Sequence, residues 1–256
     1  MFKFISIFIA FFICTSFSFA QVNTEKFRKE NGAKGFSGKV SLAAGFASGN
    51  SEFVNVKSGA RIDYSVKNFD FFIVGNYEFQ QAKEEKIVNK AFAHLRSIIT
   101  LTPALLLEFF LQKEFNQFIL LEDRNLAGSG LRLDVIRLFS GTEDSLVEIY
   151  WGSGLMFENE RYNISVSPKT NLFRSTNYLT INWQITNNFS FTTINYFQFD
   201  TKRLHDYRIL SDAGFNFSIT EDLAFNSSLS WRYDNEPVEG VKKYDVEVTN
   251  GITFSF

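Results

Sequence analysis

The sequence predicts an all-β chain, a transmembrane antiparallel up-and-down β-barrel of about 12 strands. Three features predict it: a dozen segments in which apolar and polar residues alternate, an apolar targeting segment before them, and a last alternating strand that stops at Phe256. Alternation with period two gives a strand one apolar and one polar face. A closed sheet with its apolar face outward pairs its backbone groups internally, so it can cross a membrane.

The first twenty residues have the pattern of a cleaved signal peptide. Lys3 gives a positive start, residues 5–13 are apolar, and small residues lead to Ala20. The apolar run is shorter than the roughly 20 residues that a membrane-spanning helix needs. We therefore expect residues 1–20 to be removed by cleavage between Ala20 and Gln21. Cys14 is the only cysteine, so the mature chain is expected to form no disulfide.

The charge balance and the hydropathy limit the class of the remaining chain. Without Lys3 it has 25 basic and 28 acidic residues, and 25 − 28 gives a net charge of −3. Nucleic-acid binding usually needs a clear basic excess, which is missing here. The mean hydropathy of −0.08 would suit a soluble protein. In a transmembrane barrel, however, the polar face offsets the apolar face in such an average.

The elements follow in order. Residues 21–35 are polar and charged without alternation, so we expect a periplasmic lead-in that is too short for a folded plug. Residues 36–256 are expected to form the barrel as one domain, because no linker-like stretch interrupts them. The expected strands cover residues 36–47, 54–64, 69–80, 90–99, 105–114, 131–135, 147–158, 173–184, 189–199, 207–218, 223–234 and 244–256. Most are 9 to 12 residues long, as a tilted strand needs to cross the hydrocarbon layer.

The last strand shows the pattern clearly. Its apolar side carries Tyr244, Val246, Val248, Ile252, Phe254 and Phe256, and its polar side carries Asp245, Glu247, Thr249, Gly251, Thr253 and Ser255. Phe254 and the terminal Phe256 resemble the last-strand signal that the outer-membrane assembly machinery of Gram-negative bacteria reads. We therefore expect this machinery as a partner during biogenesis, outer-membrane lipid as the surroundings, and a monomer as the final state.

The connections between strands alternate in length. Tight turns are expected at residues 66–68, 101–104, 186–188 and 220–222, with residues 137–145 as a longer exception. Longer and more charged loops are expected at residues 82–89, 117–124, 159–171, 200–204 and 235–243. Short periplasmic turns and longer outer loops are typical of bacterial barrels. Alternation alone also fits a soluble sandwich, but the aromatic residues near strand ends, the strand lengths, the loop asymmetry and Phe256 together favour the membrane.

A family resemblance rests on the segments 89–96, 107–118 and 121–132 and on the early Gly45-Phe-Ala-Ser-Gly-Asn50. These segments resemble the salt-induced outer-membrane protein family, a group of bacterial barrels of unknown function. The resemblance covers nearly all of the mature chain. It implies an outer-membrane barrel, and it brings no catalytic or binding residues that could be transferred.

Specific chemistry is expected only on the polar face, which would line or fill the interior. Candidate constriction residues are Arg96, Glu108, Glu114 and Arg132. Eight strands leave a packed interior and sixteen leave an open channel, so twelve strands allow either a narrow pore or an occluded interior. The leading hypothesis is a narrow pore for ions or small polar solutes. The alternative is a non-conducting barrel that supports envelope integrity under salt or osmotic stress.

Other kinds of site have little support in the sequence. His94 and His205 are the only histidines, and Ser97 lies on the opposite face of its strand from His94. We therefore expect no enzyme and neither a metal nor a cofactor. The apolar residues 119–121 beside a charged loop are unusual. They either fold into the barrel mouth as a partial constriction or extend the neighbouring strands beyond the membrane.

Overall fold

The computed structural model describes residues 23–28, 34–50, 52–83, 85–141, 146–164 and 170–254. The expected signal peptide, its cleavage site between Ala20 and Gln21, and the terminal Phe256 lie outside these residues. No helix among the described residues is long and apolar enough to span a membrane.

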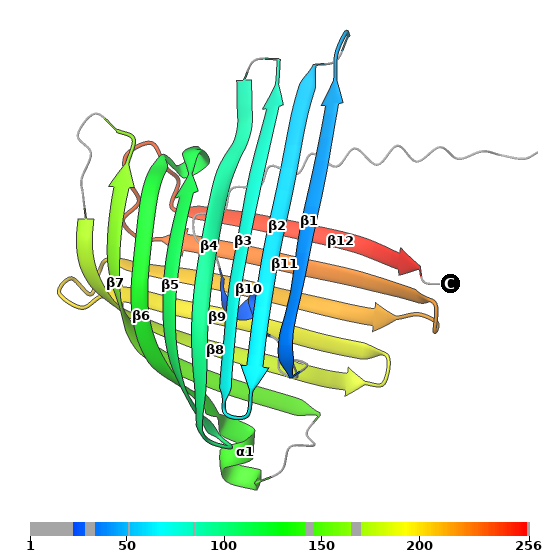
Figure 1. Ribbon diagram of the computed structural model, residues 1–256, viewed down its shortest axis with the longest axis vertical. Coiled ribbons are helices and arrows are strands. Elements are labelled where there is room, and N and C mark those ends of the chain that lie inside the picture. The colour runs from blue at the N-terminus through cyan, green and yellow to red at the C-terminus, as the bar shows by residue number, and fades with distance from the viewer. Residues whose placement is uncertain are drawn as a thin grey trace, which may run out of the picture.

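Twelve strands form one sheet in which each strand pairs with the next along the chain (Figure 1). The strands are β1 (Gly35–Ala47), β2 (Phe53–Val66), β3 (Phe69–Ala82), β4 (Glu85–Thr102), β5 (Leu105–Asn116), β6 (Leu121–Asp134), β7 (Val147–Tyr162), β8 (Thr170–Thr186), β9 (Phe189–Asp200), β10 (Tyr207–Ser218), β11 (Leu223–Asp234) and β12 (Tyr244–Phe254). Every neighbouring pair that the structure describes is antiparallel. The predicted fold class, an up-and-down arrangement of twelve antiparallel strands, is confirmed.

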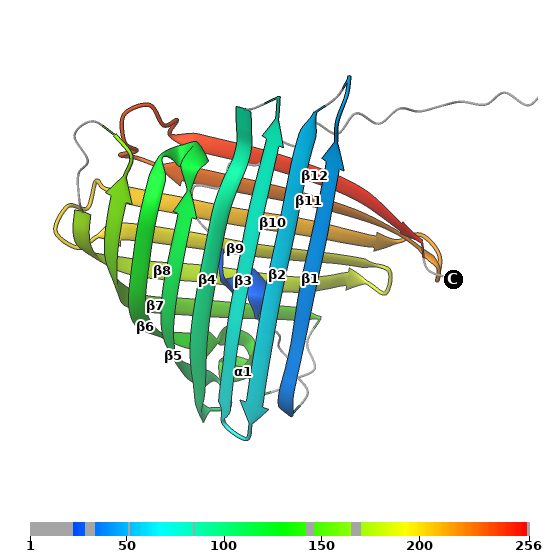
Figure 2. The ribbon, with the colours of Figure 1, turned by 45° about the horizontal axis from the view of Figure 1, so that its top comes forward.

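The sheet curls over on itself and encloses an interior. Strands β1–β6 cross in front of β8–β12 at a steep angle, and β7 lies where the sheet bends between them (Figures 1 and 2). The short 3₁₀ helix η1 (Glu25–Phe27) lies between the front and back strands (Figure 2). No ladder between β1 and β12 is found within the described residues.

The faces of the sheet have the polarity expected for a membrane barrel and not that of a soluble sandwich. Large apolar side chains point outward and are exposed, including Leu111 at 55% and Trp151 at 53%. Charged side chains point inward and are buried, including Arg124 at 1% and Glu158 at 0%. A soluble sandwich would bury the first set and expose the second.

Two of the expected loops are largely strand. Residues 82–89 were expected to be a loop, but β3 runs to Ala82 and β4 begins at Glu85, with Ala82 opposite Glu85 and a register shift after Gln80. Residues 117–124 contain only the 3₁₀ helix η2 (Gln117–Ile119) before β6 starts at Leu121. Both segments are charged, which suggested loops, but at a strand end polar side chains can reach water while the backbone still pairs.

The long exception among the tight turns contains a helix. Residues 135–140 form α1 (Val135–Ser140), which was not expected. The Asp134 side chain accepts a hydrogen bond from the Arg137 backbone N–H at 2.9 Å and caps its first turn. Gly141 ends it with a positive φ of 69°, a conformation that glycine adopts without strain. The helix therefore begins and ends with ordinary local signals.

Glycines on β6 and β7 leave room for large interior side chains. A Cβ atom at Gly152 would meet the ring of Tyr178, so that ring lies where a side chain would otherwise stand. Gly130 and Gly154 lie opposite each other in the ladder. A Cβ atom at Gly154 would meet the Ser129 carbonyl oxygen and the Gly130 Cα atom, which are backbone and cannot turn aside.

We predict that Gly154→Ala lowers the free energy of unfolding by about 1–3 kcal/mol, the usual cost of overpacking. The matched control is Gly251→Ala, because no heavy atom lies within 4 Å of a Cβ at Gly251. Urea unfolding of the refolded protein in detergent micelles measures both changes. Equal stability of the two variants would contradict the close approach of β6 and β7.

Candidate functional site: a filled polar interior

One interior network is centred on Arg124. The strand register places Glu114, Arg124 and Glu160 directly opposite one another on β5, β6 and β7. Arg124 Nε lies 2.5 Å from Glu160 Oε1, and Arg124 Nη1 also contacts Glu114 Oε1. All three side chains are almost fully buried. Opposite charges on facing positions of neighbouring strands stabilise each other, and here the register alone brings them together.

Two further arginines extend this network around the wall. Arg208 Nη1 lies 2.9 Å from Glu158 Oε2 and 3.0 Å from Glu160 Oε1. Arg174 Nε lies 2.7 Å from Glu158 Oε1. Each arginine has one further acidic partner. Arg174 Nη1 lies 2.8 Å from Asp206 Oδ1, and Arg208 Nε lies 2.8 Å from Asp234 Oδ2. Charges from β5 to β11 thus form one continuous network, which we call the Arg124 network.

An apolar cap lies at the end of the interior next to the Arg124 network. Ile119, Leu121 and Tyr162 are buried together. Side chains from two connections pack against them: Ile164 after β7, and Val238 and Val241 between β11 and β12. Of the unusual apolar residues 119–121, Ile119 and Leu121 thus pack into the cap at this end of the interior, and β6 begins at Leu121.

The second network is centred on Arg96, a predicted constriction residue on β4. Arg96 Nη1 contacts Glu25 Oε1 and lies 3.3 Å from Glu108 Oε2 on β5. Arg96 Nη2 donates to the Thr24 hydroxyl oxygen at 2.6 Å. Arg28 holds the Glu25 carboxylate with two hydrogen bonds of 2.9 and 3.1 Å, and its Nη2 also contacts Glu108. We call these residues the Arg96 network.

Three of the five residues of the Arg96 network come from the N-terminal segment, residues 23–28. Asn23 is fully buried, and its Nδ2 donates to Asp212 Oδ2 on β10 at 2.5 Å. Arg61 Nη1 on β2 donates to the Phe27 carbonyl oxygen at 2.5 Å. The Phe27 ring packs on an inward apolar patch formed by Phe72, Val74 and Ile98 with Phe92 and Leu106. The structure thus places this part of the expected lead-in inside the curled sheet.

The Glu25 carboxyl group is ionised in this setting. Burial by itself would raise its pKa, but the guanidinium groups of Arg28, Arg96 and Arg132 outweigh burial and hold the pKa well below its ordinary value of 4.5. A carboxylate between guanidinium groups makes strong, charge-assisted hydrogen bonds. Glu25 therefore anchors the segment as an anion.

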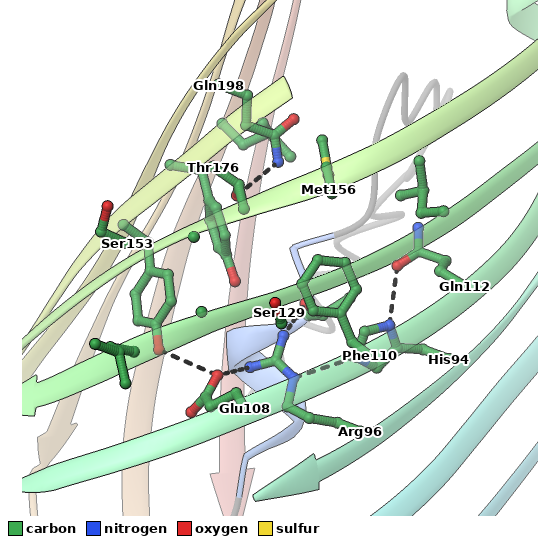
Figure 3. Close-up of a pocket in the computed structure, with 18 residues that line it drawn as sticks. His94, Arg96, Glu108, Phe110, Gln112, Ser129, Ser153, Met156, Thr176 and Gln198 are labelled. Atoms are coloured by element: carbon green, nitrogen blue, oxygen red, sulfur yellow. Dashed lines mark hydrogen bonds and ion pairs between the residues drawn. The ribbon is translucent and has the colours of Figure 1, made fainter. Parts of the chain in front are cut away.

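A small cavity lies beside the Arg96 network (Figure 3). Its volume is about 40 Å³, enough for only a few water molecules. His94 lines it, with Nδ1 3.0 Å from Gln112 Oε1, while Arg96 Nε donates to His94 Nε2 at 3.3 Å. His94 is therefore a neutral ring that donates through Nδ1 and accepts through Nε2.

The four predicted constriction residues are all inward and buried. Arg96 and Glu108 belong to the Arg96 network, and Glu114 belongs to the Arg124 network. Arg132 on β6 stacks on Tyr150, with Cζ 3.8 Å from the ring centroid. The four side chains therefore fill the interior at two levels and do not form a single ring.

No catalytic or metal arrangement emerges from the described residues. Within them, no group of three or more His, Cys, Asp or Glu side chains is placed to hold a metal ion. His94 is engaged by Gln112 and Arg96. His205 lies in the exposed connection before β10, with Nε2 3.2 Å from Glu236. What the arrangement can do chemically is bind ionic groups in a buried polar space.

A family model described as "Protein of unknown function, DUF481" matches residues 40–256. The chain belongs to the DUF481 family. The match covers the whole sheet after the start of β1 and leaves out the N-terminal segment. A comparison of this DUF481 chain with curated proteins finds no match.

Solved structures with a similar course of the chain include a porin and a channel. The NanC porin has 10% identity and a TM-score of 0.48, over 86% of this chain and 98% of that one. The CymD monoaromatic hydrocarbon channel has 9% identity and a TM-score of 0.47, over 88% and 80% of the chains. A Pseudomonas aeruginosa FadL homologue has 9% identity and a TM-score of 0.38, over 85% and 72%. At these values the likeness carries no conclusion about function.

We predict that Arg124→Ala lowers the free energy of unfolding by about 3–5 kcal/mol, because it leaves Glu114 and Glu160 buried without their shared cation. The control is Arg161→Ala on β7, which removes a pair with Glu122 whose side chains are both about half exposed. That change is expected to cost at most about 1 kcal/mol. Urea unfolding in micelles measures both, and similar losses would contradict the buried network.

We also predict how Glu25→Gln changes stability with pH. A carboxyl group whose pKa is lowered on folding stabilises the folded state fully above its ordinary pKa, and this contribution is lost as the pH falls toward the lowered value. The difference in unfolding free energy between wild type and Glu25→Gln should stay constant from about pH 7 to about pH 5 and shrink below pH 4.5. A difference that disappears between about pH 7 and pH 6 would contradict an anionic, paired Glu25.

Proposed function

We propose that this DUF481 chain is an integral outer-membrane barrel that provides a narrow pore for ions or small polar solutes, closed in the described conformation. The reversed polarity of the sheet carries the proposal: exposed apolar residues such as Leu111 and Trp151 cover the outer face, and buried charges such as Arg124 and Glu158 cover the inner face. An inner wall of this kind offers a polar path only if the barrel stands in lipid.

The closed state follows from what fills the interior. The N-terminal segment lies across the middle, bound to Arg96 on β4, Glu108 on β5 and Asp212 on β10. Its described residues belong to no ladder of the sheet. Side-chain contacts can break without loss of a backbone ladder, so release of this segment is the simplest route to an open interior.

A second candidate function is a non-conducting barrel that supports the envelope under salt or osmotic stress. The extensive pairing of interior charges favours it, above all the Arg124 network behind its apolar cap. Outer-membrane lipid would surround either barrel, and the barrel assembly machinery would insert it after the signal peptide is removed.

We predict different single-channel behaviour for wild type and for a variant that releases the N-terminal segment. The variant Asn23→Ala/Glu25→Ala/Arg28→Ala keeps every wall residue but removes the side-chain contacts that Asn23, Glu25 and Arg28 make to Asp212, Arg96 and Glu108. In planar bilayers the mature wild type should give rare conductance steps. The variant should give frequent ohmic conductance steps, because the N-terminal segment no longer lies across the interior.

Controls decide between the two candidates. Glu122→Ala, an exposed change, should behave as wild type. Heat-modifiable gel mobility confirms folding, and boiled samples should give no steps. Folded wild type and folded variant that both stay silent would favour the non-conducting barrel. Equally frequent conductance steps in wild type and variant would support the pore but contradict the proposal that the N-terminal segment closes it.

A further inference from the structure

The Glu25 carboxylate occupies a position that is built for a carboxylate but is filled by the chain itself. Two guanidinium groups hold it: Arg28 through the hydrogen bonds of 2.9 and 3.1 Å, and Arg96 through Nη1. Arg132 adds a third positive charge that acts on it. All of these side chains lie in the interior and are nearly inaccessible to water.

Arg96 is shared between two carboxylates, Glu25 of the N-terminal segment and Glu108 of the wall. Once the segment is set aside, Glu108 is the wall carboxylate that still contacts Arg96. A guanidinium group keeps its charge under all ordinary conditions, so a buried arginine needs an anionic partner. Within the described residues, Glu25 supplies the second carboxylate for Arg96. A solute carboxylate that displaces Glu25 would restore this second contact.

We propose that Arg96 is the binding site for the carboxylate of a small polar solute, and that Glu25 occupies this site as an internal competitor. The inference rests on the proposed function for its access route, since the solute would enter from the polar interior. The Thr24 hydroxyl oxygen also accepts a hydrogen bond from Arg96 Nη2, while Glu25 contacts Nη1. The N-terminal segment therefore occupies both terminal nitrogens of the Arg96 guanidinium group. The planar fork of arginine matches a carboxylate better than a spherical anion.

The space beside Arg96 sets the size of the solute. The cavity next to it has a volume of about 40 Å³, so a solute fits only as the N-terminal segment withdraws. Polar groups stand around this cavity on several strands, among them Gln112 on β5, Thr176 on β8 and Gln198 on β9 (Figure 3). Gln198 Nε2 donates to Thr176 at 3.4 Å, a long bond that a solute hydroxyl could replace. Carboxylates with a short polar body therefore fit this place best.

The first experiment asks whether the position binds a free carboxylate. Glu25→Ala leaves a gap between Arg28 and Arg96, so sodium acetate should raise the unfolding temperature of the folded full-length mature variant. Sodium chloride at equal ionic strength should raise it less. The control Glu122→Ala should show no difference between the salts, since Glu122 is exposed. No acetate effect on folded Glu25→Ala would overturn the proposal, and so would an equal effect of phosphate.

The second experiment asks whether a solute competes with Glu25 in a chain that keeps both Glu25 and Arg96, which a purely structural Glu25 would not allow. Asn23→Cys places a single thiol at a position that is fully buried. Acetate should speed the labelling of this thiol by a maleimide about twofold or more. This effect should appear once acetate reaches millimolar concentrations, because a tethered competitor such as Glu25 has an effective concentration in that range. Adding Arg96→Gln should give fast labelling that acetate no longer changes.

The outcomes of the second experiment separate the two proposals. Labelling that responds equally to acetate and to chloride would overturn the carboxylate site, even if Glu25→Ala is too unstable to study. Both experiments run in detergent micelles and need no conductance. If the chain never conducts but binds acetate, the carboxylate site is supported and the pore is contradicted. If the chain conducts but shows no acetate effect, the pore is supported and the carboxylate site is contradicted.

Discussion

The interior depends on one constraint: a buried guanidinium group stays charged and must meet a carboxylate. On β6 and β7 the strand register meets this demand, because Arg124 and Glu160 face each other in the ladder. Arg96 on β4 has Phe110 opposite it on β5, so its carboxylate partners lie elsewhere. Glu108 lies diagonally across the ladder, and Glu25 comes from outside the sheet. The position of the N-terminal segment follows from this shortage of facing acids.

The alternation of apolar and polar residues was enough to predict the strands and the inward, buried position of the charged side chains. It works because the strand period is two and one face meets apolar surroundings. It failed where polar residues continue a strand, as at Glu85, and where a short helix replaces the end of an expected strand and the start of the connection after it, as at Val135. The N-terminal segment has no period at all, since its residues bind individually through side chains. No pattern in residues 23–28 alone could place them in the interior.

The sequence does carry one signal for the place where the N-terminal segment docks. Residues 71–74 of β3 are apolar without a break, so both faces of the strand are apolar there. A strand whose inward face meets only polar surroundings has no reason to carry Phe72 and Val74 inward. These residues meet Phe27 in the structure. A local loss of alternation in a barrel strand thus marks where something apolar packs inside.

The bond between Asn23 and Asp212 joins residues 189 positions apart in the chain. Contacts of such separation form late, because the entropy of closing a long loop is lost before the contact can contribute. Asp212 lies on β10, so the N-terminal segment cannot complete its binding until β10 has been made and has taken its place in the sheet. The first residues of the described chain are therefore among the last to reach their place, and their arrival marks the completion of folding.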